Sequence, residues 1–163
     1  MTDRTSRLVR AGLLTGVTDG LFATVQSAVT PGSTVMKLWQ GVASVVLGKS
    51  AYDGGVPTAL LGLLMHFCVA FTWSAVFLFV VMRSSWVRRT VSSPPGVVGI
   101  AALYGPFIWL FMSLIVIPVL LHRPPKITSR WWIQLVGHIP FVGLPIVASI
   151  ANGGAKGEIG ERA

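Results

Sequence analysis

The chain has 163 residues, of which 53% are hydrophobic and only 11% are charged. Soluble domains carry about 25% charged residues, so this composition argues against a soluble enzyme or binding domain and indicates an integral membrane protein. The formal net charge is +8, but the basic residues stand singly or in threes at the ends of apolar runs, which disfavours nucleic-acid binding and makes membrane lipid the expected partner.

The first predicted span covers residues 10–30 and holds a stripe of small residues with one carboxylate. Glycines at four-residue intervals let helix backbones approach closely in lipid, which predicts helix packing at Gly12, Gly16 and Gly20. Asp19 falls about 20° from Gly12 around the helix axis, so it is expected to face the same neighbouring helix. Packing within one chain and packing between copies both stay open, so a homo-oligomer or another membrane protein is a candidate partner.

A short helical pattern follows at residues 34–48, after the turn Thr30-Pro31-Gly32-Ser33. A helix over its last fourteen residues rises only ~21 Å, which is too short for a hydrocarbon core of ~30 Å. The segment is therefore predicted to be an interfacial helix anchored by Trp39, or alternatively a re-entrant half-helix.

The second predicted span, residues 56–82, contains no formally charged side chain. A helix of this length rises ~40 Å and is apolar all round, as a bilayer requires. One of its faces is built from small residues at four-residue intervals with a histidine at the centre, which predicts a helix-packing surface: Thr58, Gly62, His66, Ala70 and Ser74.

Two further spans are predicted at residues 96–121 and 131–151, followed by a mobile tail at 152–163. Their internal prolines, Pro106, Pro118, Pro140 and Pro145, remove amide donors, so neighbouring groups must satisfy the freed carbonyls. Together these segments predict one transmembrane domain, residues 1–163: an all-α integral membrane four-helix bundle with a short interfacial or re-entrant helix between the first two spans.

Four polar residues inside the spans are predicted to form a buried cluster: Asp19, His66, Gln134 and His138. The favoured interpretation is that they hydrogen-bond one another and fix helix register in a structural or accessory membrane protein. A small-solute, ion or proton pathway lined by Asp19, His66 and His138 is the first alternative. Ligation of haem b by His66 and His138 is the second, and a metal site with Asp19 as third ligand is the least favoured.

The sequence lacks the GxSxG, HExxH, P-loop and Rossmann patterns of common enzyme families. An enzyme is therefore not favoured, no catalytic residue is assigned, and no cofactor is predicted outside the haem alternative. Placing the N-terminus inside assigns eight cations to the cytoplasm and five to the outside. This bias predicts that both termini of the multi-pass chain are cytoplasmic.

Three stretches resemble a group of uncharacterised bacterial inner-membrane proteins with four helices, and more distantly YagU-type proteins. The stretches are LWQGVASVVLGKSAYDGGVPTALLGLLMHFCVAF, LYGPFIWLFMSLIVIPV and GHIPFVGLPIVASI. The resemblance covers roughly residues 10–150 and makes pattern positions of Gln40, Gly54, Gly55, His66 and His138. It implies a location in the bacterial inner membrane and no particular activity.

Overall fold

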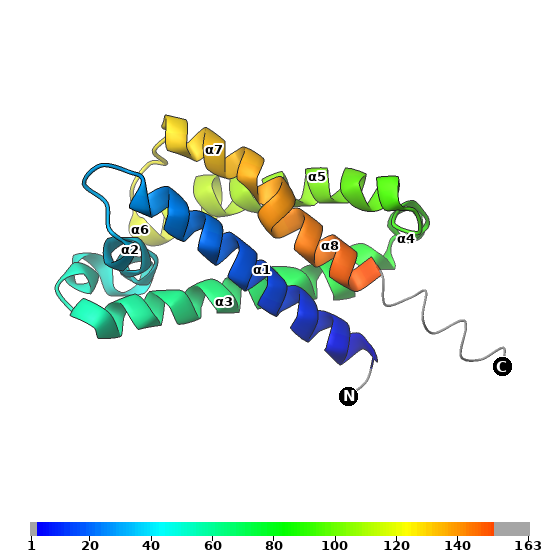
Figure 1. Cartoon of the computed structure of the whole chain (residues 1–163), viewed down its shortest axis with the longest axis horizontal. Coiled ribbons are helices and arrows are strands. Elements are labelled where there is room, and N and C mark those ends of the chain that lie inside the picture. Colours follow the sequence, from blue (N-terminus) through cyan, green and yellow to red (C-terminus); the bar gives the residue numbers. More distant parts are fainter. Residues whose placement is uncertain (1–2, 152–163) are drawn as a thin grey trace.

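The computed structural model describes residues 3–151, and every regular element in that range is helical (Figure 1). The predicted tail, residues 152–163, lies outside the described residues. In chain order the elements are α1 (Asp3–Ala28), α2 (Val35–Leu47), η1 (Gly48–Tyr52), α3 (Gly55–Phe79), η2 (Val81–Arg83), α4 (Ser85–Thr90), α5 (Pro94–Phe111), η3 (Met112–Val116), α6 (Ile117–Leu121), α7 (Ser129–His138), η4 (Ile139–Gly143) and α8 (Leu144–Ala151).

Four continuous helical rods are long and apolar enough to cross a membrane: Asp3–Ala28, Gly55–Arg83, Pro94–Leu121 and Ser129–Ala151. The predicted all-α four-helix bundle is therefore confirmed. The first rod begins seven residues before the predicted span at residues 10–30, because Arg is a good helix former and Asp3 is favourable in a first helical turn. A charged flank ends a membrane span but does not end a helix.

The two ends of the bundle hold different elements (Figure 1). We call the end with α4, the start of α1 and the end of α8 the α4 end, and the opposite end the α2 end. At the α4 end, Arg7 Nη1 donates to the Ile150 carbonyl at 3.5 Å, and Arg10 Nη2 donates to the Ser149 carbonyl. Because the last carbonyls of a helix have no amide partner, these guanidinium groups tie the start of the chain to the end of α8.

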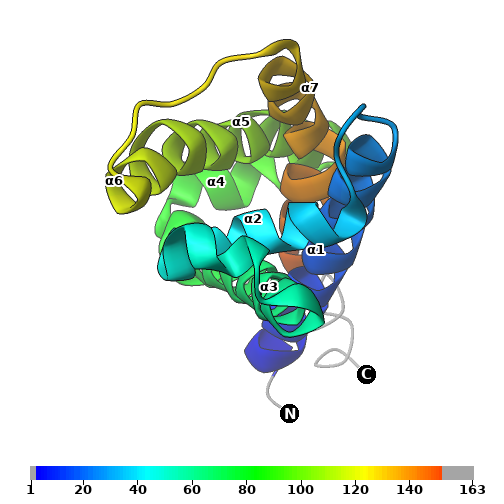
Figure 2. The same ribbon diagram turned by 90° about the vertical axis from the view of Figure 1, so that its left-hand side faces the viewer.

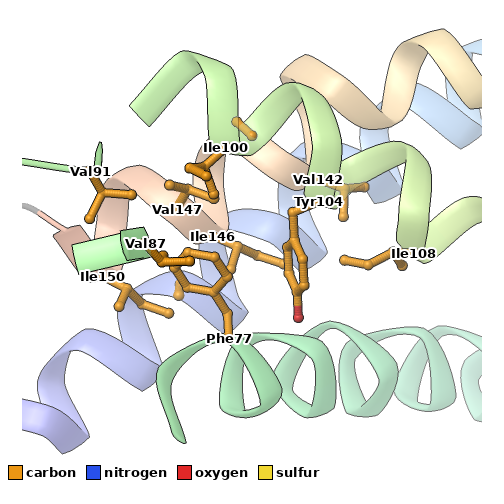
Figure 3. Packing of buried hydrophobic residues seen from close by; sticks show 12 residues of the cluster. Phe77, Val87, Val91, Ile100, Tyr104, Ile108, Val142, Ile146, Val147 and Ile150 are labelled. Atoms are coloured by element: carbon orange, nitrogen blue, oxygen red, sulfur yellow. The ribbon is translucent and has the colours of Figure 1, made fainter. Parts of the chain in front are cut away.

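The main apolar core lies toward the α4 end, where side chains from α3, α5 and α8 interdigitate (Figure 3). Phe77, Ile146, Val147 and Ile150 are fully buried in it. Tyr104 joins this core with its ring and donates its hydroxyl proton to the Trp73 carbonyl at 2.8 Å. This half of the bundle is therefore closed by packed side chains.

The outward faces of the rods are apolar along their length. Leu21 is 61% exposed, Leu64 62%, Leu103 66% and Val136 64%, and they lie on four different rods. Soluble monomers rarely expose large continuous apolar surfaces. The outside of this bundle therefore has the character of a surface solvated by lipid tails.

Helix α2 lies across the α2 end of the bundle rather than along it (Figures 1 and 2). Its buried Gln40 donates from Nε2 to the Gly55 carbonyl at 3.1 Å, which fixes α2 to the first turn of α3. Gly55 has φ +60°, a conformation that favours glycine. Gln40 and Gly55, two positions that carry the resemblance to bacterial inner-membrane proteins, therefore have structural roles here. The backbones of α2 and α3 are in contact two turns further along α3, where a Cβ atom at Gly62 would overlap the Trp39 carbonyl oxygen.

The glycine stripe of α1 packs inside the chain, against aromatic rings of α3. A Cβ at Gly12 would collide with Phe71, and a Cβ at Gly16 would collide with Phe67. The space above Gly20 is bordered by His66 and Trp39. Because glycine has no side chain, these positions leave room for the phenylalanine rings of α3 rather than for the backbone of another helix. This packing brings α3 close to Asp19.

Candidate functional site

Asp19 on α1 and His66 on α3 form a close pair in the middle of the bundle. Asp19 Oδ2 lies 3.9 Å from His66 Nδ1, and both side chains are largely buried, at 17% and 14% exposure. His66 Nε2 lies 3.0 Å from the Gly16 carbonyl oxygen, and Trp39 packs edge-on against the ring. The close approach that Gly16 and Gly20 permit is what allows the imidazole to reach the α1 backbone.

The hydrogen-bond partners of His66 define what its other nitrogen can do. A carbonyl oxygen only accepts, so His66 Nε2 must carry a proton. In a neutral ring Nδ1 then presents a lone pair to the Asp19 carboxylate, which also only accepts. A favourable contact requires one proton between them, carried either by Asp19 or by His66. At 3.9 Å the two atoms are within ion-pair range but beyond direct hydrogen-bond distance.

His138 on α7 is the third ionisable group, and it bonds to its own helix. Its Nδ1 donates to the Gln134 carbonyl at 2.8 Å, and its ring packs 4.9 Å from that of Trp109. Within the described part of the chain its Nε2 has no hydrogen-bond partner. With Nδ1 as the donor, Nε2 of the neutral ring is a free proton acceptor.

Gln134 belongs to a separate polar network that the sequence analysis did not predict. Gln26 Oε1 on α1 accepts from Gln134 Nε2 at 2.7 Å and from Arg130 Nε at 3.1 Å. Gln26 is 8% exposed, and the signal for it in the sequence is a glutamine inside the apolar first span. The predicted cluster is thus divided: Asp19 pairs with His66, Gln134 pairs with Gln26, and His138 lies between the two pairs.

Two neighbouring cavities connect these groups. The inner cavity, of about 190 Å³, is lined by Asp19, His66 and His138 among mostly apolar side chains. The outer cavity, of about 350 Å³, also touches Asp19 and His138 and extends to Lys126 and Arg130 at the α2 end. Residues common to both linings form the boundary between the cavities: Asp19, Val42, Trp109 and His138.

Several polar atoms around the inner cavity are buried without a protein partner. They are Thr15 Oγ1, Asp19 Oδ1 and Trp109 Nε1, and all three residues line this cavity. Buried polar groups in proteins nearly always have a hydrogen-bond partner, so an orphaned set at one cavity indicates bound water or ligand. At ~30 Å³ per molecule the inner cavity has room for about six waters.

The inner cavity is closed toward the α4 end. Ile108, Val142 and Ile146 belong both to its lining and to the apolar core shown in Figure 3. Phe77 and Ile150 fill the space beyond with no exposed surface. The packed core therefore closes the route to the α4 end, whereas the outer cavity extends to the α2 end.

Within residues 3–151 no three His, Cys, Asp or Glu side chains come close enough to hold a metal ion. The cavity lined by both histidines is smaller than the ~300 Å³ of small ligand pockets, and His66 Nε2 is engaged with Gly16. This geometry does not fit a haem.

Comparison with protein-family models, curated proteins and solved structures finds no match for this chain. The resemblance to YagU-type and other bacterial inner-membrane proteins therefore stays a prediction, and the site must be interpreted from its own geometry.

Proposed function

We propose that this protein is a bacterial inner-membrane protein that takes up and transfers protons through Asp19, His66 and His138. The observation that carries the proposal is the inner cavity, which brings these groups together beside orphaned polar atoms. Intramembrane ionisable residues that face a cavity are commonly part of proton or ion pathways.

The pairing of the polar groups favours transfer over a purely structural role. Gln26 and Gln134 bond each other directly, although Gln26 Nε2 has no partner among the described residues. Asp19 Oδ1 and Trp109 Nε1 also have none, but these two residues line the inner cavity, and the Asp19–His66 contact needs one proton. Water in the inner cavity would link this pair to the free Nε2 of His138.

The size of the inner cavity favours protons over other solutes. The inner cavity admits only a few waters, which argues against larger organic molecules. Lys126 and Arg130 border the outer cavity, and their positive charges oppose metal cations and protons alike. The preference for protons therefore rests on size, because a proton passes by exchange along hydrogen-bonded water and does not carry a hydration shell.

Transfer to the α4 end requires rearrangement of the core. Phe77 and Ile146 block the direct route, so we propose that uptake from the α2 end alternates with opening of this packing. We propose that the α4 end faces the cytoplasm, and the excess of basic residues predicted on that side supports this orientation. Uptake then occurs from the outer face of the membrane.

The test is proton flux into liposomes that contain the purified protein, driven by a potassium diffusion potential and followed with an internal pH-sensitive dye. The wild type is expected to exceed empty liposomes, and Asp19→Asn to reduce the rate at least tenfold because an amide cannot carry the proton. Asp53→Asn is the matched control, since this carboxylate lies between η1 and α3, outside both cavities.

Absence of flux in the wild type, or wild-type flux in Asp19→Asn, would refute the proposal. The second candidate is a structural or accessory membrane protein, favoured by the Gln26, Gln134 and Arg130 network. It predicts no flux together with a large loss of stability when Gln26 is replaced.

A further inference from the structure

A second polar cavity lies at the α4 end, far from the Asp19–His66 pair. It has a volume of about 510 Å³ and lies between the start of α1, the end of α3 and α4. Its polar lining consists of Asp3 and four arginines: Arg4, Arg7, Arg83 and Arg88. Four guanidinium groups and one carboxylate leave a surplus of three positive charges around one cavity.

The arginines of this cavity differ in how they are held. Arg7 pairs with Asp3, and Arg88 Nη1 donates to the carbonyls of Met82 at 2.9 Å and Arg83 at 2.6 Å. The described residues offer the side chains of Arg4 and Arg83 no hydrogen-bond or ion-pair partner. Arg7 and Arg88 are thus held by the protein, whereas the guanidinium groups of Arg4 and Arg83 are available to an external anion. The paired N–H donors of a guanidinium group match the oxygen geometry of a phosphate.

The apolar part of the cavity indicates what kind of anion fits. Leu78, Phe79 and Met82 also line it, and they are the last residues of an apolar span. Phe79 is 45% exposed and the adjacent Val80 61% exposed, so an apolar surface continues from the arginines toward the lipid-facing side. A ligand with a phosphate next to acyl chains matches both parts, whereas free phosphate matches only one.

We propose that this cavity binds the headgroup of an anionic phospholipid, with the phosphate among Arg4, Arg83 and Arg88 and the acyl chains along Leu78 and Phe79. Basic pockets between transmembrane helices at the level of the headgroups are known sites for anionic lipids. The site is independent of the proton pathway, because it shares no lining residue with the inner or outer cavity.

The experiment is a titration of phosphatidylglycerol into the purified full chain in phosphatidylcholine mixed micelles, with retained lipid measured by native mass spectrometry. The wild type is expected to retain phosphatidylglycerol in preference to phosphatidylcholine. The double variant Arg4→Gln/Arg83→Gln should weaken this binding about fivefold per arginine removed. Neither side chain has a described partner, so the melting temperature should stay unchanged.

The matched control is Arg89→Gln/Lys49→Gln, which removes the same charge from exposed positions outside the cavity. It should leave binding within twofold of the wild type. Equal loss in both double variants, or no loss in Arg4→Gln/Arg83→Gln, would overturn the proposal. Displacement of the lipid by millimolar inorganic phosphate would also overturn it, because the site would then recognise the anion without the acyl chains.

Discussion

The Thr18 hydroxyl on α1 lies 2.6 Å from the Phe141 carbonyl oxygen in η4, and its one proton also lies within reach of the Leu14 carbonyl at 2.8 Å. Pro145 follows Phe141 by four residues and has no amide proton, so the α-helical donor to the Phe141 carbonyl is absent. The prolines were expected to require such compensation from neighbouring groups. The contact shows that a side chain of another span supplies it, which ties α1 to the irregular turn between α7 and α8.

Thr18→Val should therefore destabilise the bundle. Valine keeps the shape of threonine but leaves the Phe141 carbonyl without a donor, a loss of about 1 kcal/mol in the free energy of unfolding. Thr72→Val is the matched control, because that exposed hydroxyl bonds only to Cys68 in its own helix. Thermal melting in detergent, followed by circular dichroism, compares the two. Equal melting temperatures would show that Thr18 does not support η4.

Gly62→Ala should separate α2 from α3. The new methyl group would meet the Trp39 carbonyl, which is backbone and cannot rotate away, so we expect a cost of about 1–3 kcal/mol. Gly99→Ala adds the same methyl on another span, where no atom lies within 4 Å, and should be neutral or stabilising. Melting in detergent again reports the result, and equal behaviour of the two variants would contradict the close approach of α2.

The spans could be predicted from the sequence because lipid imposes a simple requirement of length and apolarity on each helix. The uncharged run at residues 56–82 became the rod Gly55–Arg83, and residues 34–48 became α2 at Val35–Leu47. The largest error in a span boundary lies at the charged start of α1, because charge limits membrane insertion and not helix formation.

The site was less predictable because periodicity gives the face of a helix but not its partner. Asp19 and His66 were expected together and are adjacent, yet Gln134 bonds to Gln26 instead. Trp109 contributes an orphaned donor to the inner cavity, although an aromatic residue in an apolar span gives no signal of that role. The cavities depend on how side chains of four rods fill space, which no spacing rule describes.

Gln26→Leu should be among the most destabilising single changes in the spans. It removes the shared acceptor of Gln134 and Arg130 and leaves both donors buried or half-buried without a partner, at about 1–3 kcal/mol for each unsatisfied group. Gln26→Glu keeps an acceptor and adds a charge-assisted bond to Arg130, so it should melt at or above the wild-type temperature. If both variants lose the same stability, the network contributes by packing alone.

Asp19→Asn separates a functional carboxylate from a structural one. Asp19 makes no close hydrogen bond, since Oδ1 has no described partner and Oδ2 is 3.9 Å from His66, so its replacement should not lower the melting temperature. His66→Ala should lower it, because that change removes the bond to the Gly16 carbonyl and the ring packed beside Trp39. Thermal melting in detergent compares the two variants, and marked destabilisation of Asp19→Asn would favour the structural interpretation.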